Sequence, residues 1–371
     1  MDLNREKTLD YLRGLAVFQV VFVHTIYWLD IIKPESLTVV KSFTLFEMSL
    51  FFFVTGAVNS LKDHRSYGSF CIKRIRGLMI PYYIYAAVCI GISVIYYTAS
   101  GELSLFQAAK MVLSWLIPVN TQIMPLWYFT WALWFVPVYL VAIVFFPLIK
   151  RAVNRFGRTA IAFQVLIFII IEIILNLSLK QVPDEGAGIY VNQLSDIIRE
   201  SFFYMIFMGT GVLYPQLKMR KKKDLAISSA ILISSFAGLL ISALLLGDTL
   251  DMQINKFPAN HVFLCYSFAF MTVLYLAMPL IKKMYRFLIG KIPPTDRFFI
   301  TLSENSITVF LYQSFAFWMT GLMLTLFNLD NTVFEPFAAI LLVYPLVWLT
   351  IKIKILIRSF RKADGKSSSE S

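Results

Sequence analysis

Apolar segments of about 20 residues follow one another along the whole chain, separated by short polar and charged stretches. A segment of this length crosses the hydrocarbon core of a bilayer as an α-helix. A hydropathy window of about 19 residues predicts ten such spans, at 9–29, 39–61, 78–98, 127–149, 159–179, 201–217, 225–246, 261–281, 298–322 and 333–351. A shorter apolar segment, 105–117, is expected to lie in the membrane interface or to re-enter the membrane.

The composition supports this pattern. Of 371 residues, 58% are apolar and only 15% are charged, so a soluble domain of this composition would expose large apolar patches. The predicted fold class is therefore all-α: a polytopic membrane helical bundle of about ten transmembrane helices. We expect one integral-membrane domain over residues 1–360 and a disordered cytoplasmic tail over residues 361–371. The first span lacks a signal-peptide cleavage pattern and is expected to be retained.

The distribution of Lys and Arg predicts the orientation. If the N-terminus is cytoplasmic, 28 of the 34 basic residues fall on the inner side of the membrane. The six on the outer side are Lys33, Lys41, Lys110, Lys180, Arg199 and Lys256. This asymmetry is typical of cytoplasmic loops, so both termini are expected inside and the protein in the plasma (inner) membrane. The net charge of +12 then reflects topology and attraction to anionic membrane lipid, and no nucleic-acid partner is expected.

The first predicted span carries an arginine near one end and a histidine well inside it. Arg13 and His24 are eleven residues apart, which at about 100° per residue places both on one helical face, ~16.5 Å apart along the axis. Ionisable groups within a membrane helix are energetically unfavourable and often mark a pathway or a reaction centre. The alternative for His24 is a neutral imidazole that is hydrogen-bonded to a neighbouring helix.

Glu47 in the second predicted span is the expected partner of His24. Each lies six residues, or ~9 Å of helix, from the outer end of its span, so the two side chains fall at similar depth. A carboxylate beside an imidazole favours the protonated ring and can fix its tautomer, which suits a general base. The pair is therefore the catalytic candidate. A structural buried pair, or a Glu47 side chain that extends to the outer surface, remains the alternative.

Arg74 and Arg76 lie in KRIRGLMIPYY, at the inner end of the third span and near the same membrane face as Arg13. Three guanidinium groups at one face can hold a polyphosphate, because Arg binds phosphate oxygens in bidentate fashion. The alternative is ordinary interfacial anchoring, with the Arg13 side chain extending to the membrane surface.

Other residues give weaker indications of chemistry. A tryptophan and tyrosine cluster that begins at Trp127 and includes Trp134 fits an interfacial aromatic belt, or sugar stacking near an outer cleft. Glu172 is expected to form a structural interhelical hydrogen bond, and Gly56, Gly209 and Gly211 are expected to allow close helix approach. The three cysteines and three histidines are too scattered for a disulfide framework or a metal site, and no metal is expected.

Five segments resemble the membrane acyltransferase-3 family and occur in the order typical of that family. LDYLRGLAVFQVVFVHT, with Arg13 and His24, is similar to its signature, and FFFVTG is similar to its second-helix motif. KRIRGLMIPYY, LWFVP at 133–137 and SENSITVFLYQ at 303–313 resemble its third-helix, fourth-helix and late-helix stretches. The resemblance covers nearly the whole chain, and the single-domain sugar O-acetyltransferases are the most similar branch.

The resemblance implies an enzyme that transfers an acyl group, usually acetyl from cytoplasmic acetyl-CoA, to a hydroxyl of a surface polysaccharide or its lipid-linked precursor. It implies that His24 is catalytic and that Arg13 handles the donor. We assign Arg74 and Arg76 to the same donor site. We assign Trp127, Trp134 and Gln313 to the acceptor side. A narrow channel for the pantetheine arm of the donor is expected along the face of the first helix, between Arg13 and His24.

The chain departs from the family pattern at three points. Relatives often carry His where Glu47 stands, another His near Gln313, and a second Arg where Gly77 sits. Two alternative functions remain open. An exporter of polysaccharide or lipid-linked glycan would need a continuous polar lumen, and a sensory or scaffold membrane domain would have no use for the buried Arg13 and His24 face.

Overall fold

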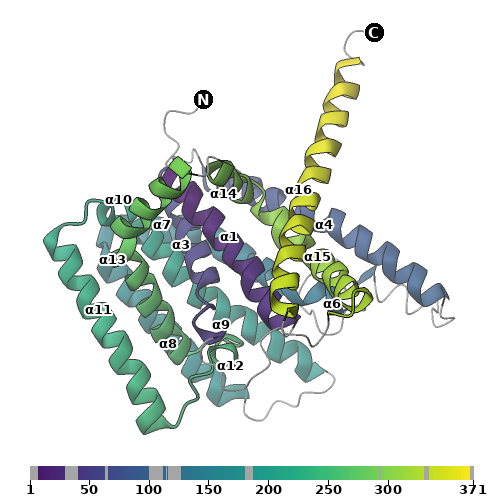
Figure 1. The fold of residues 1–371 in the computed structure, drawn as a ribbon. Coiled ribbons are helices and arrows are strands. Elements are labelled where there is room, and N and C mark those ends of the chain that lie inside the picture. The colour runs from purple at the N-terminus through teal and green to yellow at the C-terminus, as the bar shows by residue number, and fades with distance from the viewer. Residues whose placement is uncertain are drawn as a thin grey trace.

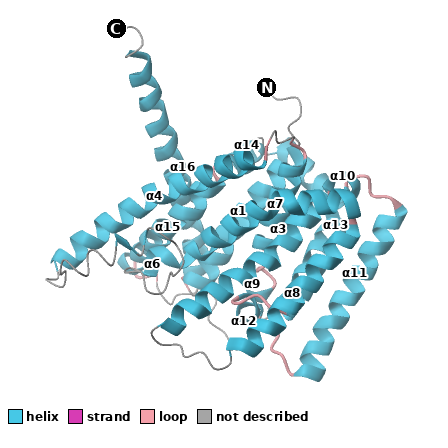
Figure 2. Cartoon of the chain, turned by 180° about the vertical axis from the view of Figure 1, so that it is seen from behind, coloured by secondary structure: helices cyan, strands magenta, loops and turns pink. Residues whose placement is uncertain are grey.

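The computed structural model describes residues 7–29, 41–62, 66–99, 112–113, 115, 127–179, 187–291, 294–329 and 334–367. Within these ranges the chain forms helices joined by turns and loops, and no strand (Figures 1 and 2). The all-α fold class predicted from the sequence is confirmed.

The helices follow one another in this order: α1 (Lys7–Trp28), α3 (Glu47–Ser60), α4 (Tyr67–Ala99), α6 (Trp127–Thr130), the 3-10 helix η2 (Trp131–Trp134), α7 (Phe135–Phe156), α8 (Arg158–Leu179), α9 (Ala187–Val212), α10 (Tyr214–Leu217), α11 (Lys222–Ile241), the π-helix η3 (Ser242–Leu246), α12 (Met252–Lys256), α13 (His261–Lys291), α14 (Pro294–Glu304), α15 (Ser306–Leu326) and α16 (Glu335–Ser367).

Eight helical stretches in the described part of the chain are long and apolar enough to cross a membrane, which confirms a polytopic membrane protein. They include α1, α4, α7, α8, α11, α13, α15 and α16. The other two predicted spans fall on α3 and α9. With 14 residues, α3 is ~21 Å long and shorter than the hydrocarbon core. The 26-residue α9 carries three charged residues, Asp196, Arg199 and Glu200.

The short α3 lies in the middle of the bundle, where it packs against α9 and α1. The long α9 also contacts α7 and α8, and α1 also contacts α14 and α15. Burial follows this arrangement: 56% of the apolar window of α1 is buried, against 11% for α11, which joins the bundle mainly through α13. The inner helices therefore carry the polar residues that a site needs, while the outer ones present apolar side chains.

Several predicted boundaries differ from the structure. Helix α4 begins at Tyr67 instead of 78, α9 begins at Ala187 instead of 201, and α13 ends at Lys291 instead of 281. The predicted span 298–322 is two helices, because the polar stretch around Asn305 divides α14 from α15. The predicted span 127–149 begins with α6 and the 3-10 helix η2 before α7, and α7 ends at Gly157, whose φ of 58° favours glycine. Helix α16 continues to Ser367, so residues 361–367 of the predicted disordered tail are helical. Most of 105–117 lies outside the described residues.

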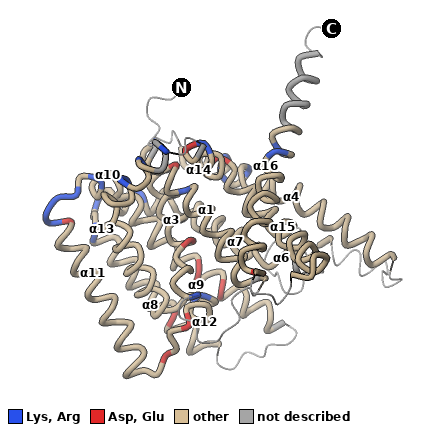
Figure 3. Tube along the Cα trace, in the orientation of Figure 1, with Lys and Arg blue, Asp and Glu red and all other residues tan. Residues whose placement is uncertain are grey.

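Basic residues gather at one end of the bundle. Figure 3 shows Lys and Arg around α10, α13 and α14, where α1 also begins, and Asp and Glu concentrated near α9 and α12. The C-terminal part of α16 extends from the same end of the bundle (Figure 1). We call this the basic end. The arrangement agrees with the orientation expected from the loops.

Two glycines set the distance between α3 and α9. A Cβ atom at Gly56 would lie 1.9 Å from the carbonyl oxygen of Met208, and one at Gly211 would lie 2.1 Å from that of Phe53. Only glycine allows the two backbones to approach so closely, as in other membrane helix pairs with small residues at the contact. Beside this contact Phe52 of α3 stacks on Tyr204 of α9, with ring centroids 4.7 Å apart.

We predict that Gly56→Ala lowers the free energy of unfolding by about 1–3 kcal/mol, because the added methyl group forces two packed backbones apart. Thermal unfolding of the purified protein in detergent measures this change. Gly91→Ala is the matched control, since a Cβ at this exposed position in α4 has no atom within 4 Å. Equal unfolding temperatures for the two variants would contradict the prediction.

Candidate functional site

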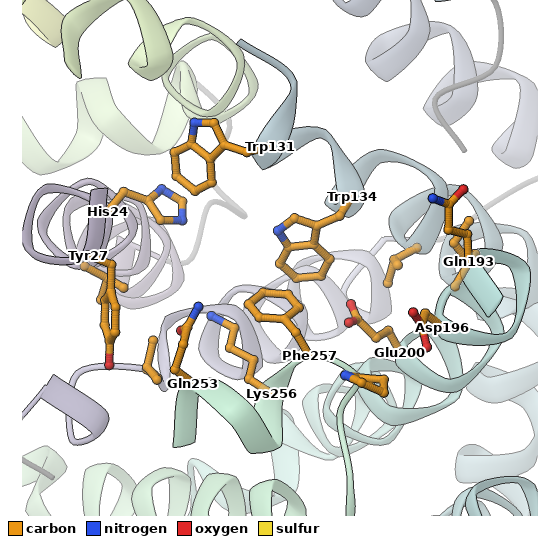
Figure 4. Close-up of a pocket in the computed structure, with 15 residues that line it drawn as sticks. His24, Tyr27, Trp131, Trp134, Gln193, Asp196, Glu200, Gln253, Lys256 and Phe257 are labelled. Atoms are coloured by element: carbon orange, nitrogen blue, oxygen red, sulfur yellow. The ribbon is translucent and has the colours of Figure 1, made fainter. Parts of the chain in front are cut away.

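A cavity of about 530 Å³ opens beside His24, toward the end of α1 that is far from the basic end. Figure 4 shows the lining side chains converging from separate parts of the chain. They come from α1, η2 and α9, from α12 with the two residues after it, and from Leu45 before α3 and Val138 of α7. The volume lies in the range of pockets that bind small organic molecules.

Helical periodicity explains how two of these elements face the cavity. On α9 the lining residues are Gln193, Asp196, Ile197 and Glu200, a spacing that places all four on one helical face. In a 3-10 helix, side chains three residues apart eclipse each other. The short η2 therefore turns Trp131 and Trp134 to the same side, and both line the cavity.

His24 is held by two neighbours. Its Nδ1 lies 3.1 Å from Oε1 of Gln313, and Trp131 contacts the ring edge-on with centroids 4.3 Å apart. Gln313 is fully buried in α15, and its Nε2 donates to the carbonyl oxygen of Phe310 at 3.0 Å. Because only the amide nitrogen can donate to a carbonyl, Oε1 must face His24 as an acceptor. The neutral imidazole therefore carries its proton on Nδ1, and Nε2 keeps a lone pair available for a proton.

The predicted pairing of Glu47 with His24 is not formed. Glu47 Oε1 instead accepts a hydrogen bond of 2.5 Å from Nζ of Lys256, and both side chains are almost completely buried. Glu47 lies close to the level of His24 along the bundle, because Lys256, which binds Glu47, lines the same cavity as His24. A buried carboxylate pairs preferentially with a cation. The sequence argument paired His24 with the wrong helix because it did not foresee that α12 brings a lysine to α3.

Two of the three predicted donor-site arginines come together. Arg13 on α1 and Arg74 on α4 are both close enough to act electrostatically on the Tyr139 hydroxyl, and Arg74 also donates to Asn59 Oδ1. Arg76 is two residues further along α4, which turns it about 200° around the helix. It is exposed and lines a separate surface hollow with Gly68 and Lys73. The structure therefore brings Arg13 and Arg74 together and leaves Arg76 outside the cluster.

Aromatic side chains fill the space between the two predicted sites. Val17 and Val20, which lie between Arg13 and His24 along α1, border a cavity of only about 20 Å³. Phe51, Phe135 and Phe310 close it, with the last two rings 4.5 Å apart. The channel expected along α1 is therefore shut in this conformation, because the apolar inner faces of α3, α7 and α15 pack against α1.

The structure places some of the remaining predicted residues at the cavity and others away from it. Trp134 lines the cavity and packs edge-on against Phe257, with centroids 4.9 Å apart. The Trp127 side chain lies outside the described residues. Gln313 contacts His24 and does not line the cavity. The structural hydrogen bond expected of Glu172 is confirmed: its Oε1 lies 2.9 Å from Nδ1 of His261, which joins α8 to α13.

Several lining residues were missed by the sequence analysis. Tyr27, Gln193, Asp196, Glu200, Gln253 and Lys256 are polar or charged and face the cavity with His24. One signal was available, because Lys256 is one of only six basic residues expected on the outer side. Among the described residues, no group of three or more His, Cys, Asp or Glu could hold a metal ion.

We predict that the neutral His24 ring carries its proton on Nδ1. Nitrogen NMR of selectively labelled histidine can test this, because the chain has only three histidines to assign. Gln313→Leu removes the acceptor and should shift the ring toward a mixture of tautomers. Gln216→Leu, at an exposed position on α10, is the control and should leave the spectrum unchanged. A wild-type His24 protonated on Nε2 would contradict the assignment.

The sequence model of one family, described as an acyltransferase domain, matches residues 6–352. No curated protein and no solved structure matched the chain. The match covers both the Arg13 and Arg74 cluster and every residue that lines the His24 cavity. A polytopic helical bundle with a histidine at a polar cavity agrees with it. The chain therefore belongs to the membrane acyltransferase-3 family, and is a multi-pass membrane acyltransferase.

Proposed function

We propose that this acyltransferase moves an acetyl group from acetyl-CoA to a hydroxyl of a carbohydrate acceptor, either a surface polysaccharide or a lipid-linked sugar, in the plasma membrane. The observation that carries the proposal is the state of His24. Its Nδ1 is committed to Gln313, and Nε2 belongs to a ring that lines a polar cavity. An imidazole in that state can take the proton from an attacking hydroxyl as a general base.

The cavity walls support a carbohydrate acceptor. Trp134 and Phe257 provide aromatic surfaces on which the apolar face of a sugar ring can stack. Gln193, Gln253 and the carboxylates of α9 provide hydrogen-bond acceptors and donors for hydroxyl groups around that ring. A wall of aromatic and apolar side chains with converging polar groups is typical of small-molecule sites.

The donor is proposed to enter from the basic end. Arg13 and Arg74 lie close to the same tyrosine hydroxyl, and paired guanidinium groups suit the phosphates of a nucleotide. The thioester would then reach His24 along α1. Phe51, Phe135 and Phe310 must move aside for this, so donor binding is proposed to open the packed region between the sites.

The exporter alternative receives no comparable support. A glycan exporter needs a polar lumen from one end of the bundle to the other. Across the residues described here, the cavity at His24 and the basic end are separated by valines and phenylalanines. That separation favours a transferase, in which only the thioester arm of the donor has to pass and no glycan crosses the bundle.

We predict that His24→Ala lowers acetyl transfer by about 10²–10⁴-fold, the usual contribution of a general base. Purified protein is incubated with radiolabelled acetyl-CoA and a panel of glycans, and labelled glycan is counted. Gln216→Ala is the activity control, and thermal unfolding of each variant tests for intact folding. Wild-type transfer by a folded His24→Ala protein would remove His24 from the reaction.

A second prediction separates the donor arginines. Loss of a charged hydrogen bond weakens binding by about 1.5–3 kcal/mol, so Arg13→Ala and Arg74→Ala should each raise KM for acetyl-CoA by roughly 10–100-fold. Arg76→Ala is the matched control and should change KM by less than about threefold, because Arg76 points away from the cluster. An equal effect of all three substitutions would contradict a donor site at Arg13 and Arg74.

A further inference from the structure

Lys256 is an unusual residue at the cavity. Its side chain is 3% exposed, at the C-terminal end of the five-residue helix α12, and it lies on the side of the bundle where basic residues are rare. It is also the only Lys or Arg among the described residues that line the His24 cavity. A cation in such a place needs compensation, because removing an ammonium from water is strongly unfavourable.

A buried carboxylate beside Lys256 compensates for the loss of water around its ammonium. Nζ of Lys256 donates a hydrogen bond of 2.5 Å to Oε1 of Glu47, and Glu200 lines the same cavity. An ammonium has three hydrogens, and within the described part of the chain Glu47 accepts one of them. The ion pair therefore fixes the position of the ammonium at the cavity and uses one of its three donors.

Lys256 also lies near His24. The two residues line the same cavity, and the ammonium is close enough to act electrostatically on the imidazole. Figure 4 shows the Lys256 side chain directed toward the part of the cavity between Gln253 and His24. A reacting carbonyl placed against Nε2 of His24 would therefore lie near a positive charge.

Acyl transfer requires such a group. When a hydroxyl attacks a thioester, the carbonyl oxygen becomes an oxyanion, and donors aimed at that oxygen give one of the largest contributions to catalysis. His24 cannot serve this purpose while it accepts the proton of the attacking hydroxyl. We propose, on the basis of the function proposed above, that Lys256 is a second catalytic residue, whose ammonium donates a hydrogen bond to this oxyanion.

The proposed step is the attack of the acceptor hydroxyl on the thioester, followed by loss of the CoA thiol. The acceptor oxygen bonds to the thioester carbon as its proton moves to Nε2 of His24, and the carbonyl electron pair moves onto oxygen, beside Lys256. The carbonyl then re-forms, the carbon–sulfur bond breaks, and the thiolate takes the proton from His24. Lys256 keeps its protons throughout, and Glu47 acts as the positioning residue that holds its ammonium in place.

A purely structural role for the ion pair is the competing explanation, since Lys256 joins α12 to α3. The two explanations differ when both partners are replaced. Lys256→Met alone leaves Glu47 buried without its cation, which lowers stability, whereas exchanging a whole buried pair for apolar residues is often neutral or stabilising. The double variant Glu47→Leu with Lys256→Met therefore separates stability from catalysis.

The test measures release of the CoA thiol from acetyl-CoA, with water as the acceptor, and thermal unfolding of the same purified proteins. We expect Lys256→Met to lower kcat by about 10²–10³-fold with little change in KM, the usual effect of losing one oxyanion donor. The double variant should regain the wild-type unfolding temperature while kcat stays low. Lys256→Arg, which keeps the charge, should recover part of kcat. Lys223→Met, at an exposed position on α11, is the control.

Recovery of kcat together with the unfolding temperature in the double variant would overturn the catalytic role of Lys256 and leave it a structural residue. Equal losses of kcat in Lys256→Arg and Lys256→Met would also overturn it. A wild-type protein that releases no thiol with water and with every glycan of the panel is a different result, because it overturns the proposed donor and with it the proposed function.

Discussion

The hydrogen bond between His24 and Gln313 determines which imidazole nitrogen is available at the cavity. It joins α1 to α15 and commits one imidazole nitrogen, so the other is left for the cavity. Gln313 can do this because it is fully buried and its amide nitrogen is occupied by Phe310. Both ends of one amide are thus used to orient one ring. The aromatic contact with Trp131 restricts the ring further.

Ionisable groups in the bundle form pairs between helices. Glu47 holds Lys256 beside the cavity, and Glu172 holds His261 between α8 and α13. In an apolar bundle an unpaired ionisable group is strongly unfavourable, so each one needs a partner on another helix. These pairs therefore connect helices as well as placing charge. The first pair also brings a cation to the histidine, and we propose that catalysis uses it.

The two ends of the bundle carry different side chains, and mainly apolar side chains fill the space between them. Arg13 and Arg74 lie near the basic end, while the cavity with His24 lies beyond Phe51, Phe135 and Phe310. Such a layer keeps water and solutes from crossing the membrane. A thioester that passes it must displace aromatic side chains, so the proposed reaction couples donor binding to movement of the inner helices. Gly56 and Gly211 keep the backbones of α3 and α9 in close contact.

The sequence by itself determined the class of fold and most of the helices, and it identified His24 as the catalytic candidate. Apolar segment length and loop charge are sufficient for this, because a bilayer requires about 20 apolar residues for each span. It also identified Gly56 and Gly211 as sites of close approach and Glu172 as a structural residue. The boundary at Asn305 and the short η2 were missed, since hydropathy averaged over a window does not detect a local break.

Only the tertiary structure decided which residues meet. Equal depth in the membrane suggested Glu47 as the partner of His24, but depth does not specify rotation about the helix axis or the neighbouring helix. Rotation turns His24 to Gln313 on α15 and Glu47 to Lys256 on α12, residues more than two hundred positions away in the chain. It also separates Arg74 from Arg76 and gathers one face of α9 at the cavity. Such contacts depend on how all the helices pack together, and no local pattern of residues encodes that packing.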